Sequence, residues 1–176
     1  MTGRKHIFIT GSRGSGKSHL VNNMLKHMSD SFNLLQSHRT DTPQVVIKSN
    51  LVADNKEFVI GVPRTSGINP ASKGNNMTII EDGFINCAIP AIDTHLDTTT
   101  ERLFVIDELG YLESSCIPFQ KAVEKLLDNS HVLAVIRKQS TEFLNRICNR
   151  KDVLVIDIDS TFETLSCIIM ASCMSK

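Results

Sequence analysis

The sequence predicts a three-layer α/β fold built on a mostly parallel sheet. Two observations indicate it: continuous apolar runs alternate with segments of helical periodicity, and a glycine-rich segment joins the first run to the first helix. Strands that are apolar throughout are covered on both faces, as in parallel sheets. No repeat and no low-complexity linker divides the 176 residues, so we expect a single domain over 1–176.

The first strand, loop and helix come from the N-terminal residues. Residues 5–10 (KHIFIT) form a short β-rich run, and a glycine-rich segment occupies residues 11–18. The apolar residues that follow recur at helical spacing: Leu20, Val21, Met24, Leu25 and Met28. The order is therefore strand, loop, helix.

The pattern changes between Asn33 and Glu81. Three short β-like runs, QVVIK, EFVIGV and MTIIE, are separated by segments rich in Asn, Gly, Pro and Asp. We expect a partly antiparallel β insertion here. Pro90 is expected in the first turn of a helix that carries Ile92 and Leu96.

The C-terminal half alternates regularly between strand and helix. RLFVID, HVLAVIR and VLVIDI are predicted strands. One helix begins at Pro118, and a second carries Phe143, Leu144 and Ile147. Ser160 and Glu163 have the spacing of a capping box, which predicts a final helix from that point.

The glycine-rich segment fits the P-loop pattern G-x-x-x-x-G-K-[ST]. Glycines allow the backbone to curl so that its N–H groups point at phosphate oxygens, and the following helix adds its N-terminal amides. We expect Lys17 to reach the β- and γ-phosphates and Ser18 to ligate Mg²⁺. His19, in the first helical turn, is expected near the nucleotide. The predicted nucleotide-binding residues are Gly11, Ser12, Arg13, Gly14, Ser15, Gly16, Lys17, Ser18 and His19.

A second motif follows some ninety residues later. In Phe104-Val105-Ile106-Asp107-Glu108, three apolar residues bury a strand and place Asp107 at its C-terminal end, where ligands of open α/β sheets bind. This is the pattern of a Walker B strand. Asp107 is expected to hold Mg²⁺, and Glu108 to orient and activate a water in line with the γ-phosphate.

Residues 103–113, LFVIDELGYLE, resemble the D-E-[IL]-G-x-[ML]-E signature of the THEP-type nucleoside-triphosphatases, also called the cancer-related NTPase family. FQKAVEKLLDN, HVLAVIRKQSTEFLNRI and NRKDVLVIDI follow in that family's order and spacing. The resemblance covers about two-thirds of the chain. It implies a RecA-like P-loop core and slow hydrolysis of ATP, GTP and other nucleoside triphosphates to the diphosphate and phosphate. It marks Asp107, Glu108, Gly110 and Glu113 as site residues. The Mg²⁺ requirement is expected from Ser18 and Asp107.

The chain departs from that family at two places. Tyr111 stands where members usually have Lys or Arg. Members also carry a G-F-x-T-x-E-x-R segment after the first helix, and the nearest sequence here is residues 35–40. These differences indicate a specialised branch.

Arginines can stabilise charge on the transferring phosphoryl group. The candidates are Arg137, which ends a predicted strand on the catalytic side, and also Arg13, Arg64, Arg146 and Arg150; Arg137 is the one taken into the predicted catalytic set. The predicted catalytic set is therefore Lys17, Glu108, Glu113 and Arg137. Two alternatives share the same phosphate cradle: a kinase for nucleosides, nucleotides or small molecules, and a nucleotide-gated switch or assembly factor with a protein partner. A Ras-like GTPase is disfavoured because the only Asn-Lys, at 55–56, continues with Glu-Phe instead of completing N-K-x-D.

Composition limits the remaining partners. The 19 Lys and Arg residues balance 19 Asp and Glu residues, which disfavours a nucleic-acid-binding protein. The five cysteines lack metal-site spacing, which favours free thiols in a reducing compartment. No signal-peptide pattern and no membrane-length apolar run is present. We therefore expect a cytoplasmic protein without membrane contact, whose partner is a nucleoside triphosphate; a protein partner stays open.

Overall fold

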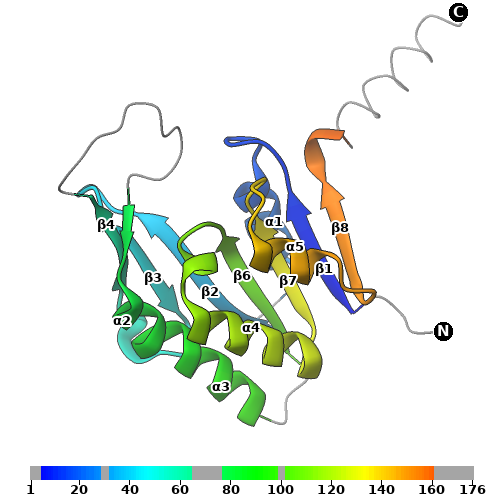
Figure 1. The fold of residues 1–176 in the computed structure, drawn as a ribbon. Helices are drawn as coiled ribbons and strands as arrows, with labels where there is room; N and C mark the ends of the chain where they lie inside the picture. Colours follow the sequence, from blue (N-terminus) through cyan, green and yellow to red (C-terminus); the bar gives the residue numbers. More distant parts are fainter. Residues whose placement is uncertain (1–4, 29–31, 65–76, 99–101, 161–176) are drawn as a thin grey trace, which may run out of the picture.

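The computed structural model describes residues 5–28, 32–64, 77–98 and 102–160. Eight strands form one sheet in the order β5-β4-β3-β2-β6-β7-β1-β8 (Figure 1). The strands are β1 His6–Thr10, β2 Phe32–Arg39, β3 Val45–Ser49, β4 Phe58–Pro63, β5 Met77–Ile79, β6 Leu103–Leu109, β7 Val132–Ile136 and β8 Val153–Asp157. The helical segments are α1 Lys17–Lys26, η1 Ala53–Asn55, α2 Glu81–Gly83, η2 Phe84–Ala88, α3 Ile89–Asp97, η3 Glu113–Ser115, α4 Ile117–Asn129 and α5 Glu142–Cys148.

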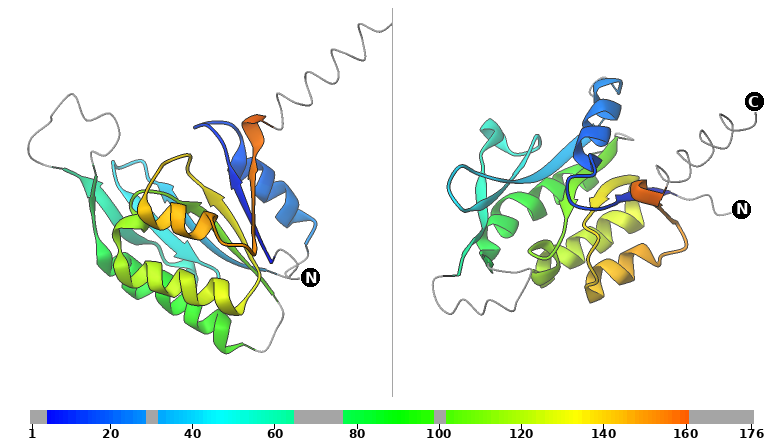
Figure 2. Two further views of the ribbon diagram at one scale, coloured as in Figure 1. Left: turned by 45° about the vertical axis from the view of Figure 1, so that its right-hand side comes forward. Right: turned by 90° about the horizontal axis from the view of Figure 1, so that it is seen from above.

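Helices cover both faces of the sheet, which confirms the three-layer prediction. On one face, α1 packs Val21 and Leu25 against Ile9, Val105 and Leu133. On the other face, α3, α4 and α5 bury a larger cluster (Figure 2). Successive strand residues point to opposite faces, so Phe104 and Ile106 of β6 join the larger cluster while Val105 joins α1.

The sheet is parallel at its centre and antiparallel at one end, as predicted. β2, β6, β7, β1 and β8 run parallel, and β3, β4 and β5 pair antiparallel beyond β2. The three predicted runs of the insertion correspond to β3, β4 and β5. Strand β2 is not predicted by the sequence pattern; it pairs in parallel with β6 and therefore belongs to the core of the sheet.

Three local features go beyond the sequence pattern. In α1, which is a helix as predicted, Val21 and Leu25 are buried while Leu20 and Met24 are 41% and 39% exposed, so only part of the apolar set faces the sheet. The helical segment ending at Asp97 begins at Glu81, because α2 and a π-helical turn precede α3, with Pro90 in the first turn of α3. β8 is an edge strand with Val155 40% exposed. The helix predicted after Ser160 lies outside the described residues.

The parallel strands place their carboxyl ends along one edge of the sheet. The segments that leave this edge begin at Gly11 after β1, at Gly110 after β6, at Arg137 after β7 and at Ile158 after β8. Ligands of open α/β sheets bind at this edge. Among the described residues, no helix is both long and apolar enough to cross a membrane.

Candidate functional site

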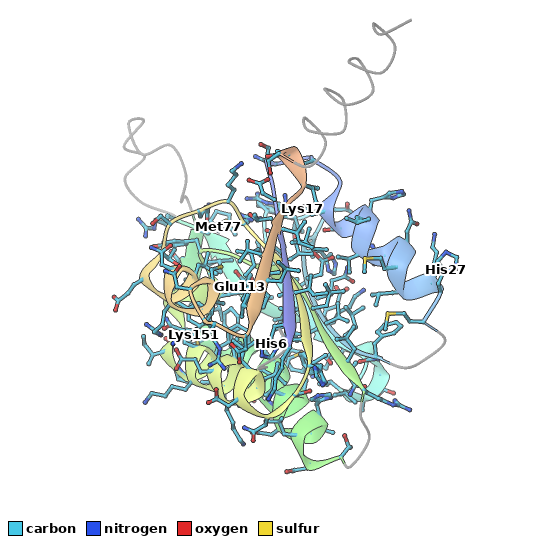
Figure 3. All side chains as sticks on the ribbon, turned by 90° about the vertical axis from the view of Figure 1, so that its right-hand side faces the viewer. His6, Lys17, His27, Met77, Glu113 and Lys151 are labelled. Carbon is cyan, nitrogen blue, oxygen red and sulfur yellow. The ribbon has the colours of Figure 1, made fainter. Side chains whose placement is uncertain are left out.

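The loop between β1 and α1 curls around the side chain of Lys17. The ammonium of Lys17 donates to the carbonyl oxygens of Gly11 (3.0 Å) and Ser12 (2.8 Å), so the lysine is buried inside the loop. Gly16, directly before the helix, has φ 88°, a left-handed conformation that glycine adopts without steric cost. Figure 3 shows Lys17 at the opposite end of the sheet from His6, which starts β1. The loop thus sits at the carboxyl edge, where the P-loop interpretation requires it.

Ser18 and Asp107 meet at this edge. Ile106 points to the face covered by α3, α4 and α5, so the side chain of the next residue, Asp107, points to the face covered by α1. Ser18 lies in the first turn of α1. The Ser18 hydroxyl donates to Asp107 Oδ1 at 2.9 Å. The Asp107 side chain is otherwise buried, at 4% exposure. Two oxygen ligands predicted from separate motifs are therefore in direct contact.

A third side chain reaches the same carboxylate from β2. Gln36 is the register partner of Asp107 in the parallel β2–β6 pair, and its Nε2 donates to Asp107 Oδ2 at 3.4 Å. Next to it, the Ser37 hydroxyl donates to Glu113 Oε1 at 3.3 Å. The end of β2 therefore contributes to the site, a contribution that the sequence pattern does not predict.

Glu108 faces the loop as a consequence of a register shift. The β6–β7 pairing shifts between Asp107 and Leu109, and such irregularities re-aim side chains next to functional sites. Glu108 Oε1 forms an ion pair with Nε of Arg137, which directly follows β7. Both residues line a hollow of about 700 Å³ together with the residues from Gly11 to His19 other than Ser15. This volume suits a small-molecule ligand.

Gly110 makes room for Arg137. A Cβ atom on Gly110 would lie 2.9 Å from Cδ of Arg137, which is closer than real Cβ contacts allow. The Arg137 backbone N–H donates to the Leu109 carbonyl at 2.9 Å, so the residue is also fixed through its main chain. The absence of a side chain at Gly110 lets the guanidinium group cross this loop to Glu108.

Glu113 is placed differently from Glu108. It is 6% exposed, and its Oε2 accepts the backbone N–H of Gly110 at 2.9 Å while Oε1 accepts from Ser37. Burial raises the pKa of Glu113, opposed mainly by hydrogen bonds from its own N–H and that of Gly110. Because both carboxylate oxygens of Glu113 accept hydrogen bonds within the protein, its role is to hold the turn after β6. Glu108, in contrast, lines the hollow beside the loop.

The other predicted residues lie around the loop with fewer contacts. Arg13 and His19 line the 700 Å³ hollow, and His19 Nε2 lies 3.0 Å from the amide nitrogen of Asn23 one turn along α1. The hollow also receives Arg39 from the end of β2, and Lys138. Neither residue was predicted. Arg39 lies within residues 35–40, the stretch set beside the family's G-F-x-T-x-E-x-R segment.

The donor set suits Mg²⁺ better than a transition metal. In the described part of the chain, no three His, Cys, Asp or Glu side chains are grouped to hold a metal ion. Ser18 and Asp107 instead offer a hydroxyl and a carboxylate beside the phosphate cradle. Mg²⁺ prefers such hard oxygen ligands and takes its remaining ones from water and substrate phosphates.

Comparisons with known proteins agree with this geometry. The model of a family described as NTPase matches residues 6–163. The nucleoside-triphosphatase THEP1 of Thermotoga sp. strain RQ2 is 26% identical over 155 residues, covering 87% of this chain and 86% of the relative. The THEP1 of Thermotoga maritima is 23% identical, with the same coverage of each chain.

Two solved structures share the fold. THEP1 from Aquifex aeolicus superposes with a TM-score of 0.70 at 18% identity, covering 86% of this chain and 88% of the other. A human cancer-related nucleoside triphosphatase superposes with a TM-score of 0.67 at 19% identity, covering 98% and 99%. The family match spans both the P-loop and the β6 motif.

Proposed function

This chain belongs to the NTPase family, and we propose that it is a magnesium-dependent enzyme that hydrolyses ATP, GTP and other nucleoside triphosphates to the diphosphate and phosphate. The observation that carries this proposal is the 2.9 Å hydrogen bond between Ser18 and Asp107. It places a hydroxyl and a carboxylate beside the loop that holds Lys17. A phosphate cradle with adjacent metal ligands is the shared requirement of P-loop NTPases.

The loop and helix α1 would bind the triphosphate. Backbone N–H groups between Gly14 and Ser18 and the N-terminus of α1 would donate to phosphate oxygens. The Lys17 ammonium, held by the carbonyls of Gly11 and Ser12, would turn toward the β- and γ-phosphates. The first turn of α1 contains no acidic residue that would repel them.

Ser18 and Asp107 would hold Mg²⁺. A bound Mg²⁺ would neutralise charge on the β- and γ-phosphate oxygens. Gln36 would keep the Asp107 carboxylate oriented through Oδ2, which leaves Oδ1 on the side of Ser18.

Glu108 would activate the attacking water. Its carboxylate would accept a proton as the water oxygen bonds to the γ-phosphorus and the bond to the β–γ bridging oxygen breaks. Arg137, which contacts Glu108, would stabilise the charge on the transferring group. Glu113 would support this pair by fixing the turn at Gly110.

We place the enzyme in the cytoplasm. Cys87, Cys116 and Cys148 are free thiols, as expected in a reducing compartment. Desolvation raises the pKa of the Cys87 thiol to about 11, so it is a packed residue instead of a nucleophile.

The test is phosphate release from ATP, GTP, CTP and UTP by the purified protein. We expect release from all four, with one phosphate per diphosphate formed. Lys17→Ala should abolish it, and Lys26→Ala, an exposed lysine at the end of the same helix, should not. Phosphate transfer to an added nucleoside or monophosphate, in place of release, would establish the kinase alternative. Phosphate release from only one of the four triphosphates would contradict the broad substrate range.

A further inference from the structure

Asp159 lies against the P-loop although 147 positions separate it from Ser12. Its Oδ2 accepts the backbone N–H of Ser12 at 2.7 Å and the Ser12 hydroxyl at 2.6 Å. Both donors of one loop residue are therefore bound by one carboxylate oxygen. Hydrogen bonds to a charged acceptor are about twice as strong as neutral ones.

Asp159 is itself held in place by contacts with Lys138 and Asp157. Lys138 Nζ lies 3.3 Å from Asp159 Oδ2 and 2.8 Å from Asp157 Oδ2, and the Asp159 N–H donates to Asp157 Oδ1 at 3.1 Å. Lys138 follows β7 and Asp157 ends β8. The contact to Ser12 thus connects the loop to the ends of two further strands.

The opposite side of Ser12 faces the lysine that would bind phosphate. The Ser12 carbonyl accepts from Lys17 Nζ at 2.8 Å. Asp159 therefore fixes the N–H and hydroxyl of the residue whose carbonyl orients Lys17. If Asp159 released Ser12, the first turn of the loop would lose its anchor, and Lys17 would lose a fixed partner.

Asp159 lies outside the phosphate hollow. It lines an adjoining hollow beside β8, which shares Ser12, Gly16 and Lys138 with the hollow beside the loop. Asp159 itself is absent from the lining of the hollow beside the loop. A carboxylate that imitated phosphate would lie inside the loop and compete with nucleotide. This position, together with charge compensation by Lys138, instead favours a supporting role.

We propose that Asp159 is a positioning residue that holds the entry turn of the P-loop in the conformation that binds the triphosphate. This inference rests on the proposed function. When the loop is already ordered, nucleotide binding carries a smaller loss of conformational entropy. Asp159 should therefore affect mainly nucleotide affinity. Asp159 itself contacts neither the phosphates nor the attacking water.

The experiment measures the dissociation constant of a non-hydrolysable triphosphate with Mg²⁺, together with kcat and KM. Asp159→Ala should weaken affinity by about tenfold or more, the loss expected for a charged hydrogen bond. The change in kcat should be smaller than the change in KM. Asp159→Asn should restore part of the affinity, because its amide oxygen still accepts from Ser12 but carries no charge. Asp93→Ala, an exposed carboxylate paired with Lys125, is the matched control and should bind as the wild type does.

Thermal unfolding without nucleotide shows whether each variant is folded. If Asp159→Ala fails to fold, Ser12→Ala takes its place, because it removes the hydroxyl donor alone and should weaken binding to a lesser degree. Unchanged affinity in the variant that is measured overturns the inference. Tighter binding in Asp159→Ala also overturns it, because the carboxylate would then be a competitor of phosphate. Suppose that the wild type binds nucleotide, that Lys17→Ala does not, and that Asp159→Ala binds as the wild type does. The positioning role of Asp159 is then wrong, while the proposed function stands. If the wild type binds no nucleoside triphosphate, the proposed function fails, and this inference fails with it.

Discussion

Ser18 and Asp107 are 89 positions apart in the chain, yet a 2.9 Å hydrogen bond joins their side chains. The contact arises because β6 lies two strands away from β1 in the sheet, and α1 begins above the edge where both strands end.

Removing the Asp107 charge should therefore weaken the binding of the metal ion. In Asp107→Asn we expect a higher Mg²⁺ concentration for half-maximal phosphate release, because an amide oxygen binds Mg²⁺ more weakly than a carboxylate does.

The control for this titration is Asp93→Asn. Asp93 lies on α3, where it pairs with Lys125 away from the site, so its metal titration should match that of the wild type. An Asp107→Asn enzyme with an unchanged titration curve would remove Asp107 from the metal site.

Glu108 and Glu113 should differ in their effect on turnover. Glu108→Gln removes the charge and most of the basicity next to the loop, and positioned acid–base groups contribute about 10²- to 10⁴-fold in rate. We expect a loss of that order in kcat with little change in nucleotide affinity. The measurement is single-turnover hydrolysis, alongside binding of the intact triphosphate.

Glu113→Gln should retain more activity than Glu108→Gln. A glutamine oxygen can still accept the Gly110 N–H, so the turn after β6 should persist. If Glu113→Gln loses hydrolysis and Glu108→Gln does not, the two roles are reversed. If neither variant is slowed, the attacking water is not activated by a carboxylate of this loop.

The Arg150–Asp152 pair should make stability depend on acid pH. Two hydrogen bonds of 3.0 and 2.9 Å from Arg150 lower the pKa of Asp152 to about 2, from an ordinary value of 3.8. Because the folded-state pKa is depressed, this stabilisation is present above the ordinary pKa and disappears as the pH falls from about 4 to about 2. It should amount to about 1 kcal/mol, since both side chains are partly exposed.

Urea unfolding of the wild type and Asp152→Asn across this pH range tests the prediction. The wild type should be more stable at pH 7, and the difference between the two proteins should shrink as the pH approaches 2. A difference that stays constant across the range would mean that the Asp152 charge does not contribute to stability.

The sequence was sufficient for the parts of the site whose chemistry requires fixed residue types. A phosphate cradle needs glycines and a lysine at set positions, and Asp107 follows a run of apolar strand residues, so both roles could be predicted from spacing alone. The structure brings the two predicted motifs together through the contact between Ser18 and Asp107. The alternation of apolar strands and helices likewise predicted the layers of the sheet. These patterns are local in the chain, which is why they are visible without the fold.

Strand β2 could not be recognised in the same way. Its buried positions include Asn33, and its last residues, Gln36 to Arg39, are polar because they end at the site, so the strand lacks the apolar pattern of its neighbours. The contact between Ser12 and Asp159 also has no local signal, since it depends on β1 and β8 lying side by side. The helix before Pro90 was missed because proline commonly starts a helix, whereas here a π-helical turn precedes it.

The contact between Gly110 and Arg137 leads to a final prediction. A Cβ at Gly110 would lie 2.9 Å from Arg137 Cδ, and Arg137 is a flexible side chain at 51% exposure, so Gly110→Ala should displace it from Glu108 without unfolding the protein. Arg137→Ala should lower kcat by about 10²-fold, the typical loss when a donor to developing charge is removed. Gly110→Ala should lower kcat in the same direction, because it misplaces the same guanidinium group.

A double-mutant cycle separates this mechanism from general damage. If Gly110→Ala acts through Arg137, the kcat of the double variant should be close to that of Arg137→Ala alone, because the effects of substitutions at residues in contact do not add. Arg102→Ala, at the opposite end of β6, is the control arginine and should leave kcat unchanged. Losses that multiply in the double variant would show that Gly110 acts independently of Arg137, for example through the hydrogen bond from its N–H to Glu113.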